Sequence, residues 1–364
     1  MPGNAAERHV LIAGGAGYIG SVLTRELLAR GFRVRVLDSL LYGNGESLAG
    51  VAEHELFSFV RGDVRSSDDL RAALEGISDV VLLASLVGDP VCKRNPELAT
   101  EVNLGGARNV LGAAGGGAVE RLIFASTCSN YGLRPDEEPA KETDDLHPLS
   151  LYAETKVEME REILGRAEEL PFAATVLRLA TAFGISPRMR FDLTVSEFTR
   201  ELVLGGELEV YDADTWRPYC HVGDISAAIV TALVAPVERV RGEVFNVGGD
   251  EGNHTKRSIV EAALDALGGE GEVTWTEGGV DARNYRVSFA KIGERLGFAP
   301  GHTVPGSIVR LAGALRAGMF DDVEQRPLYY RNFQLDQASV PAASPRGEPS
   351  AAGAGEGRGG GDAG

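Results

Sequence analysis

A glycine-spaced turn between an apolar run and a helical pattern constrains this chain more than any other feature. Residues 9–13 are apolar enough for a buried strand, and from residue 18 onward apolar side chains recur at helical spacing. Gly14, Gly17 and Gly20 lie at this junction. The missing Cβ atoms permit a tight turn and the close approach of a pyrophosphate, whose charge the first amides of the helix bind. The pattern therefore predicts a strand–turn–helix unit that binds a dinucleotide.

The end of the next apolar run indicates which dinucleotide is bound. Residues 32–37 read as a second strand, and Asp38 follows at its carboxyl end. A carboxylate there accepts hydrogen bonds from the adenosine ribose hydroxyls and repels a 2′-phosphate. NAD is therefore the expected cofactor, although Arg33 and Arg35 lie near enough in the chain to keep NADP as an alternative.

Strand-like runs alternate with helical patterns through the first half of the chain, which is typical of a doubly wound parallel (Rossmann) sheet covered by helices. We expect an NAD-binding domain at 1–182, which also carries the catalytic residues. A smaller mixed α/β lobe at 183–339 would bind mainly substrate and return some segments to the first domain. Residues 340–364 are rich in Ala, Gly, Ser and Pro and predict a disordered tail. The expected strands are 9–13, 32–37, 56–60, 80–84, 122–125, 174–179, 208–211, 244–247 and 273–275, and the helices are 68–74, 103–114, 151–170, 194–204, 225–234, 258–267 and 308–316.

Composition excludes several classes of protein. The formal charge of −17 argues against a nucleic-acid partner, which requires a basic surface. No run approaches the roughly 20 apolar residues of a membrane span, and the first residues lack a signal-peptide core. The three cysteines are odd in number and widely spaced, so neither a disulfide framework nor a metal site is predicted. These observations predict a cytoplasmic protein without a membrane partner.

Thr127, Tyr152 and Lys156 are the expected catalytic residues. A free tyrosine has a pKa of about 10, so it acts as a base at neutral pH only beside a positive charge. Lys156 lies one helical turn after Tyr152 and shares its face. Tyr152 would take the proton of a substrate alcohol while a hydride passes to the cofactor, and Thr127 would hydrogen-bond the reacting oxygen. A surface helix with Tyr and Lys four residues apart by chance is the alternative.

From about residue 9 to 316 the chain resembles the extended short-chain dehydrogenase/reductases, and among them the NAD-dependent nucleotide-sugar epimerase/dehydratase family. The resemblance rests on ordered motifs: Gly-Gly-Ala-Gly-Tyr-Ile-Gly at 14–20, Asp38-Ser-Leu, Gly62-Asp63-Val64, Leu83-Ala84-Ser85, Asn103, Ala125-Ser126-Thr127, Tyr131-Gly132, Pro148 to Lys156, Arg178, Trp216 to Asp224 and Arg283-Asn284-Tyr285.

The resemblance implies further site residues. Tyr18 and Ile19 of the glycine motif would contact the cofactor, Asp63 and Val64 would flank the adenine, and Ala84 would line the cofactor groove. The substrate would be a nucleotide-diphosphate sugar, and arginine forks suit its diphosphate. Arg217, with Arg283 or Arg286, would hold that diphosphate, and Arg188 and Arg190 would meet a sugar carboxylate or phosphate. For each arginine, a salt bridge with a nearby acid is the alternative.

One departure from the family pattern bears on the reaction. In typical sugar 4,6-dehydratases an acidic pair follows the threonine, whereas this chain has Cys128 and Ser129. Epimerisation at C4 through a 4-keto sugar is therefore expected, with NAD regenerated in each turnover. Cys128 is a candidate base for a C3 or C5 epimerase, although a buried packing role is the alternative. A 4-ketosugar reductase, a dehydratase and a non-catalytic cofactor-sensing protein also remain alternatives.

The resemblance also implies a homodimer, because the family usually pairs two helices of each subunit in a four-helix bundle. Val110, Leu111, Val157, Ile163 and Leu164 are expected to supply its apolar surface.

Overall fold

The structure is a computed structural model and describes residues 5–134, 138–269, 271–279 and 283–335. The expected tail at 340–364 lies outside the described residues.

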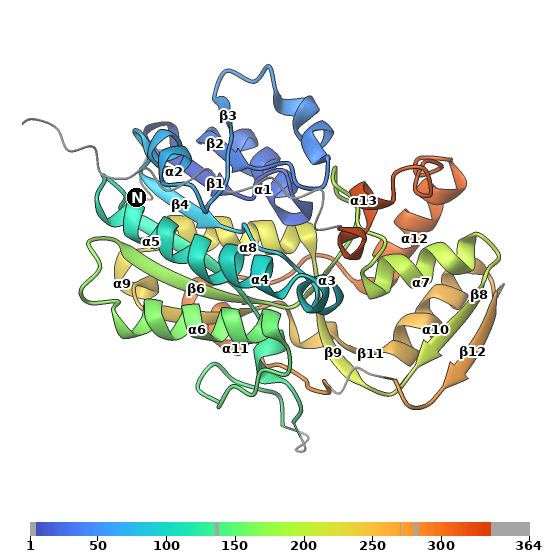
Figure 1. Cartoon of the computed structure of the whole chain (residues 1–364). Coiled ribbons are helices and arrows are strands. Elements are labelled where there is room, and N and C mark those ends of the chain that lie inside the picture. Colours follow the sequence, from blue (N-terminus) through green and yellow to red (C-terminus); the bar gives the residue numbers. More distant parts are fainter. Residues whose placement is uncertain (1–4, 135–137, 270, 280–282, 336–364) are drawn as a thin grey trace, which may run out of the picture.

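A parallel sheet of seven strands forms the centre of the larger part of the molecule (Figure 1). Its order is β10-β6-β5-β4-β1-β2-β3, so the direction of winding reverses between β1 and β4. Doubly wound sheets bind ligands at such a reversal, beyond the carboxyl ends of the strands. The expected Rossmann fold is confirmed. The strands are β1 (His9–Ala13), β2 (Arg33–Asp38), β3 (Phe57–Arg61), β4 (Asp79–Leu82), β5 (Arg121–Thr127), β6 (Ala173–Leu179) and β10 (Glu243–Val247).

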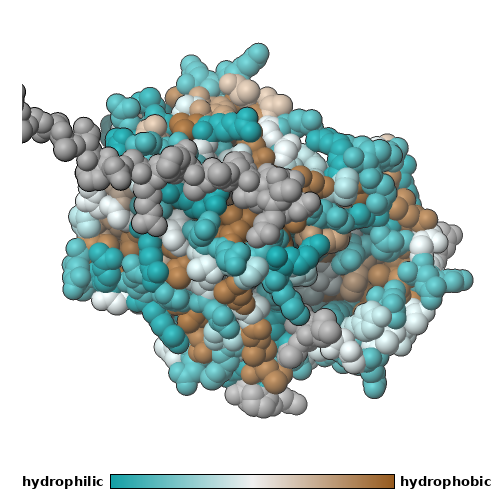
Figure 2. Space-filling model, in the orientation of Figure 1, coloured by the Kyte–Doolittle hydropathy of each residue, from teal (hydrophilic) through white to brown (hydrophobic). Residues whose placement is uncertain are grey.

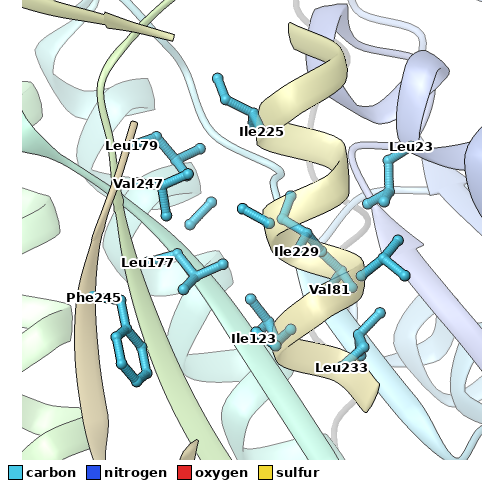
Figure 3. Packing of buried hydrophobic residues seen from close by; sticks show 14 of the residues in the cluster. Leu23, Val81, Ile123, Leu177, Leu179, Ile225, Ile229, Leu233, Phe245 and Val247 are labelled. Atoms are coloured by element: carbon cyan, nitrogen blue, oxygen red, sulfur yellow. The ribbon is translucent and has the colours of Figure 1, made fainter. Parts of the chain in front are cut away.

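The two faces of this sheet pack into separate hydrophobic clusters, because successive side chains of a strand point to opposite faces. In β1, Val10 and Ile12 join one cluster, whereas Leu11 and Ala13 join the other. Figure 3 shows Ile229 of α8 between Leu23 of α1 and the strands of the sheet. The first face is covered by α1 (Tyr18–Ala29), α8 (Val222–Val234) and α11 (Ala290–Leu296), and the second by α2 (Ser67–Leu74), α5 (Ala107–Gly115) and α6 (Leu151–Gly165).

A smaller lobe lies beside the carboxyl ends of the strands (Figure 1). It has its own core, in which Phe198, Leu208, Ile259 and Ile308 are buried. Because α8 and β10 belong to the larger part, the chain leaves the sheet after β6 and returns to it. The domain boundaries at residues 182 and 339 stay predictions. The elements of the lobe are β7 (Thr181–Phe183), α7 (Thr194–Val203), β8 (Glu207–Tyr211), β9 (Trp216–His221), β11 (Asn253–Thr255), α10 (Lys256–Leu267), β12 (Glu272–Thr276) and α12 (Val304–Arg316).

A short segment at 327–335, here called the strap, lies between the two parts. It contains α13 (Pro327–Tyr330) and a 3-10 turn, and its red trace lies near the junction with the lobe in Figure 1. At one end the Phe191 amide donates to the Tyr330 carbonyl (2.9 Å). At the other end Asn332 Nδ2 donates to the Val87 carbonyl (3.1 Å), beside α3 (Asp89–Arg94). The remaining helices are α4 (Pro96–Thr100), after α3, and α9 (Val237–Val240), before β10.

Of the five apolar residues expected at a dimer contact, Val110, Leu111, Val157 and Ile163 are buried within the chain and Leu164 is partly buried. Val110, Leu111 and Ile163 are buried in the second cluster, against the sheet of their own chain. The helical period identified an apolar face correctly, but that face packs inward. The outer faces of α5 and α6 are instead linked by ion pairs from Arg108 to Glu158 (2.7 Å) and Glu162 (2.8 Å).

Hydrophilic residues cover most of the face shown in Figure 2, and apolar residues appear there in small patches. Among the helices of the described ranges, none combines the length and the apolar character needed to cross a membrane.

Candidate active site

A cleft of about 1140 Å³ opens at the carboxyl ends of the sheet strands and extends to the lobe. Nearly all the predicted site residues line it, although they come from segments far apart in the chain. Cys128 and Arg286 are not among its lining residues. The predicted residues that do line the cleft are Gly14, Gly17, Tyr18, Ile19, Gly20, Asp38, Asp63, Val64, Ala84, Thr127, Tyr152, Lys156, Arg188, Arg190, Arg217 and Arg283.

The glycine turn leaves room for a phosphate group at the start of α1. Gly14 has a φ of +88°, and a Cβ there would lie 2.7 Å from the Ala84 amide nitrogen. A side chain at Gly20 would overlap the Gly14 carbonyl oxygen. Gly17 caps α1 without a side-chain hydrogen bond, so the first-turn amides remain available to an anion. This geometry fits the diphosphate of a dinucleotide.

Asp38 lies at the carboxyl end of β2, where two backbone amides hold its carboxylate. Its Oδ2 accepts a hydrogen bond from the Ala16 amide (3.0 Å), and its Oδ1 accepts one from the Leu40 amide (2.9 Å). Burial raises the pKa of Asp38, and these amides and Arg188 act in the opposite direction. A carboxylate has about four lone-pair sites, so each oxygen can still accept a ribose hydroxyl.

Tyr152 and Lys156 share the inner face of α6. Lys156 Nζ donates to the Ala125 carbonyl (2.8 Å) and lies 5.8 Å from the centroid of the Tyr152 ring. Burial lowers the pKa of Lys156 to about 8. Burial also raises the pKa of Tyr152, with Cys92 and Asp89 adding to the rise and Arg190 and Arg283 opposing it. Burial therefore acts against the charged form of each side chain, and a positive charge placed nearby would favour the phenolate of Tyr152.

A buried ionic network lies behind these residues and joins β5, β6 and α6. Arg178 Nη2 donates to Glu160 Oε2 (2.7 Å), and the Glu160 carboxylate also accepts hydrogen bonds from Ser126 and from Asn130 (2.7 Å). Ser126 precedes Thr127, whose Oγ1 accepts a hydrogen bond from the Ser129 amide (3.1 Å). The network fixes the strand that carries Thr127 against the helix that carries Tyr152.

Cys128 points away from the cleft into the first hydrophobic cluster. It is 1% exposed, and its Sγ donates to the Arg178 carbonyl (3.2 Å). Burial raises the pKa of the Cys128 thiol well above its usual range. A thiolate that could remove a proton from a sugar carbon is therefore disfavoured. The neighbouring Ser129 lines the cleft in its place.

The arginines expected at the substrate lie in different surroundings. Arg283 pairs with Asp89 (3.0 Å), a residue of α3 that the sequence interpretation missed. Arg217 lies over the ring of Tyr285, with 5.3 Å from its Cζ to the ring centroid. Arg286 lines a separate, smaller pocket beside Trp216.

The remaining two arginines follow the lobe strand β7. Arg190 pairs with Asp192 (2.8 Å). Arg188 is 2% exposed, and its Nε and Nη2 have no hydrogen-bond partner among the described residues.

Within the described ranges, one group of metal-binding residue types lies outside the cleft lining. His221, Asp224 and His302 have ligand atoms within 4.8 Å of one another. Several of their polar atoms already have protein partners. His221 Nδ1 accepts from the Gly223 amide (3.1 Å), Asp224 accepts from the Gly301 and His302 amides (3.0 Å each), and His302 Nδ1 lies 2.9 Å from Asp224 Oδ1. These contacts cap α8 and fix the turn before α12.

Comparisons with known proteins agree with this geometry. Residues 10–248 match the model of the NAD dependent epimerase/dehydratase family. The chain is 31% identical over 329 residues to a UDP-glucose 4-epimerase of Corynebacterium glutamicum, which covers 86% of this chain and 97% of that protein. It is 30% identical to a dTDP-glucose 4,6-dehydratase of Streptomyces griseus, over 80% of this chain and 89% of that one.

Solved structures give the same result. A Thermus thermophilus UDP-glucose 4-epimerase in complex with NAD has a TM-score of 0.75 at 29% identity and covers 85% of this chain and 99% of its own. A dTDP-glucose 4,6-dehydratase of Streptomyces venezuelae with NAD bound has a TM-score of 0.78 at 28% identity, over 88% of this chain and 99% of its own. The fold, the glycine turn and the Tyr152–Lys156 helix together with these matches show that the chain belongs to the NAD-dependent epimerase/dehydratase family and uses NAD.

Proposed function

We propose that this protein interconverts C4 epimers of a nucleotide-diphosphate sugar, with NAD recycled at the site. The observation that carries the proposal is the pair of residues after Thr127. Cys128 is buried away from the cleft and Ser129 is not an acid, so the acid–base pair of a dehydratase is missing at these positions. The similarity to UDP-glucose 4-epimerases supports the same reaction.

In this proposal Tyr152 accepts the proton of the C4 hydroxyl and later returns it. Lys156 and the positive charge of the oxidised cofactor offset the burial that otherwise keeps Tyr152 protonated. A bound NAD would supply the hydride acceptor for C4 and the hydride donor for the return step. The Thr127 hydroxyl hydrogen-bonds the C4 oxygen. The keto sugar therefore remains in the site while it rotates to present its other face to the cofactor.

We assign the sugar diphosphate to Arg217 and Arg283. Both line the cleft, whereas Arg286 lies in the separate pocket. Arg283 is paired with Asp89 and lies 3.4 Å from Ser129 Oγ, so it already faces the part of the cleft that follows Thr127. A diphosphate could take the place of the Asp89 carboxylate as a partner of Arg283, since a fork of N–H donors suits both anions.

A homodimer remains part of the proposal, with α5 and α6 as the contact surface through their outer faces. Sedimentation at micromolar protein should give a single species of twice the chain mass. A monomer at that concentration would contradict it.

The reaction is tested without added cofactor. Purified protein is incubated with UDP-glucose, UDP-galactose and the corresponding dTDP and GDP hexoses, and the products are identified by NMR. A C4 epimer that reaches equilibrium without added nicotinamide supports the proposal. A product that has lost water would identify a dehydratase, and a product that requires stoichiometric NADH would identify a 4-ketosugar reductase.

A further inference from the structure

Arg188 is a buried cation whose charge is not paired by an acid in the described part of the chain. It is 2% exposed, and two of its three guanidinium nitrogens, Nε and Nη2, are buried without a hydrogen-bond partner. Its guanidinium lies over the Tyr42 ring, 4.7 Å from the ring centroid. Burial and repulsion by Arg190 lower the pKa of Arg188 to about 10. Such a group costs free energy in the empty protein, so its position calls for an anionic ligand.

The location of Arg188 indicates which anion it meets. Its loop is fixed to the first turns of α1: Ser186 Oγ donates to the Tyr18 carbonyl (2.7 Å), and Tyr18 OH donates to the Gly184 carbonyl (2.5 Å). Arg188 is also close enough to Asp38 to affect the pKa of that carboxyl group. It therefore lies on the side of the cleft where the glycine turn and Asp38 are found, in the same cavity.

The adjacent Arg190 provides an internal comparison. Its Nε and Nη2 donate to the two oxygens of Asp192 (2.8 and 3.0 Å), so its charge is compensated by the protein. Arg190 thus has an ion-pair partner within the protein, whereas Arg188, two residues earlier, has none among the described residues. Asp192 also attracts the charge of Arg188, but among the described residues no hydrogen bond or ion pair joins the two, so the Arg188 guanidinium remains open to an anion in the cleft.

We propose that Arg188 binds the diphosphate of NAD from the lobe side, opposite the amides of α1, and that the strap keeps it there. Tyr329 OH donates to the Pro187 carbonyl (2.7 Å), directly before Arg188, and Asn332 extends the strap across to the Val87 carbonyl. The diphosphate then lies between a helix N-terminus and a fixed guanidinium. This replaces the substrate role that the sequence suggested for Arg188, and it depends on NAD binding but not on which sugar carbon reacts.

Two other sources supply the same anionic chemistry. The diphosphate of the sugar nucleotide would contact Arg188 if the substrate extended towards Asp38, and the 2′-phosphate of NADP would contact it if the cofactor were NADP. The Asp38 carboxylate disfavours the second by repulsion.

The test compares Arg188→Met with wild type. Methionine keeps a long apolar stem over Tyr42 and removes the charge. Exchange of bound NAD for labelled NAD is measured on the holoenzyme, and UDP and NADP binding are measured by calorimetry. Loss of a pair of charge-assisted hydrogen bonds weakens the affinity for a ligand by roughly 10- to 100-fold. NAD should therefore exchange faster in the variant by the same factor. The dissociation constant for UDP should stay within about two-fold, and wild type should bind NADP more weakly than NAD.

Three results would overturn the proposal: weaker UDP binding with unchanged NAD exchange, wild-type affinity for NADP equal to that for NAD, or no change in any affinity. Lys93→Met removes another cation that lines the cleft and serves as the matched control, with NAD exchange close to wild type.

Melting of cofactor-free protein separates a ligand role from a structural one. Arg188→Met should melt at the same or a higher temperature than wild type, because an unpaired buried charge is removed. A lower melting temperature with unchanged NAD exchange would show that Arg188 only stabilises the fold.

Discussion

Burial shifts the pKa values of Tyr152 and Lys156, the two side chains proposed to carry the proton chemistry, in opposite directions. It raises the pKa of Tyr152 and lowers that of Lys156 to about 8, so both charged forms are disfavoured in the protein alone. A positively charged cofactor beside the phenol changes this balance. The proposed mechanism therefore requires the oxidised cofactor for Tyr152 to act as a base.

Replacement of Tyr152 by Phe tests that reasoning at a single atom. The ring is kept, so the fold and the amount of bound NAD should be unchanged. Turnover should fall by roughly 100-fold or more, the usual scale for loss of a general base. NAD content after denaturation and steady-state rates are the two measurements. Turnover within a few-fold of wild type would mean that another group takes the proton.

Cys128→Ala distinguishes chemistry at C4 from chemistry at C3 or C5. Because the thiol lies in the core and burial raises its pKa, it should not remove a proton from carbon. The variant should stay within several-fold of wild type, and product formed in deuterated water should carry no deuterium on ring carbon. Collapse of activity together with deuterium in the wild-type product would identify Cys128 as a base.

At the scale of the element, α8 begins with a histidine that must remain neutral. His221 Nδ1 accepts from the Gly223 amide, and its ring stacks on His302 at 4.0 Å. Burial lowers the pKa of His221 to about 4, with His302 and Arg310 adding to the shift and Asp224 opposing it. The folded protein thus binds this proton less readily than the unfolded chain, whose histidine has a pKa of about 6.5.

Acid destabilisation follows from that difference. The contribution of His221 to the free energy of unfolding is complete above about pH 6.5. It is lost as the pH falls towards about 4, because in this range only the unfolded chain gains the proton. After allowance for solvent screening the loss is about 1–2 kcal/mol. His221→Asn keeps a capping oxygen without the titration, so urea unfolding between pH 6.5 and 4 should show a smaller loss. The exposed His147→Asn serves as control and should follow wild type. An equal acid loss in His221→Asn would contradict this assignment.

Elements and site residues that depend on local sequence patterns were predictable, whereas those that depend on contacts between distant segments were not. The inner strands have both faces buried, so they read as continuous apolar runs, and β1 and β6 were predicted within one residue of their ends. Strand β9 was missed because its six residues include Arg217 and Pro218. The glycine turn, Asp38 and the Tyr152 helix lie in local patterns and reach the cleft as predicted. Asp89, Tyr42 and Asn332 line it through contacts between distant segments, which no local period reveals.

At the scale of the whole molecule, the cleft lies between the larger part, built on the seven-stranded sheet, and the smaller lobe, which has its own hydrophobic core. The strap is one of the connections between them. Leu335 is 3% exposed and packs with Leu86 and Val91 of the larger part, whereas the Asn332 amide donates to Asp192 Oδ2 (2.8 Å) in the segment before α7. Since Tyr152 packs against the same apolar cluster as Leu335, the strap also contacts the cluster beside α6. In the arrangement proposed above, the strap would help to retain the cofactor between turnovers.

Two truncations test the role of the strap. Ending the chain after Leu335 removes only residues 336–364, so melting temperature and NAD exchange should match wild type. Ending it after Arg326 also removes the strap, and NAD should then exchange roughly 10-fold faster or more, since most changes in affinity appear in the dissociation rate. If the shorter chain fails to fold, Tyr329→Phe provides the same test, because it removes only the hydrogen bond to Pro187. Equal NAD exchange in wild type, the shorter chain and Tyr329→Phe would show that the strap does not retain the cofactor, and a tail truncation that loses NAD would place that function in residues 336–364 instead.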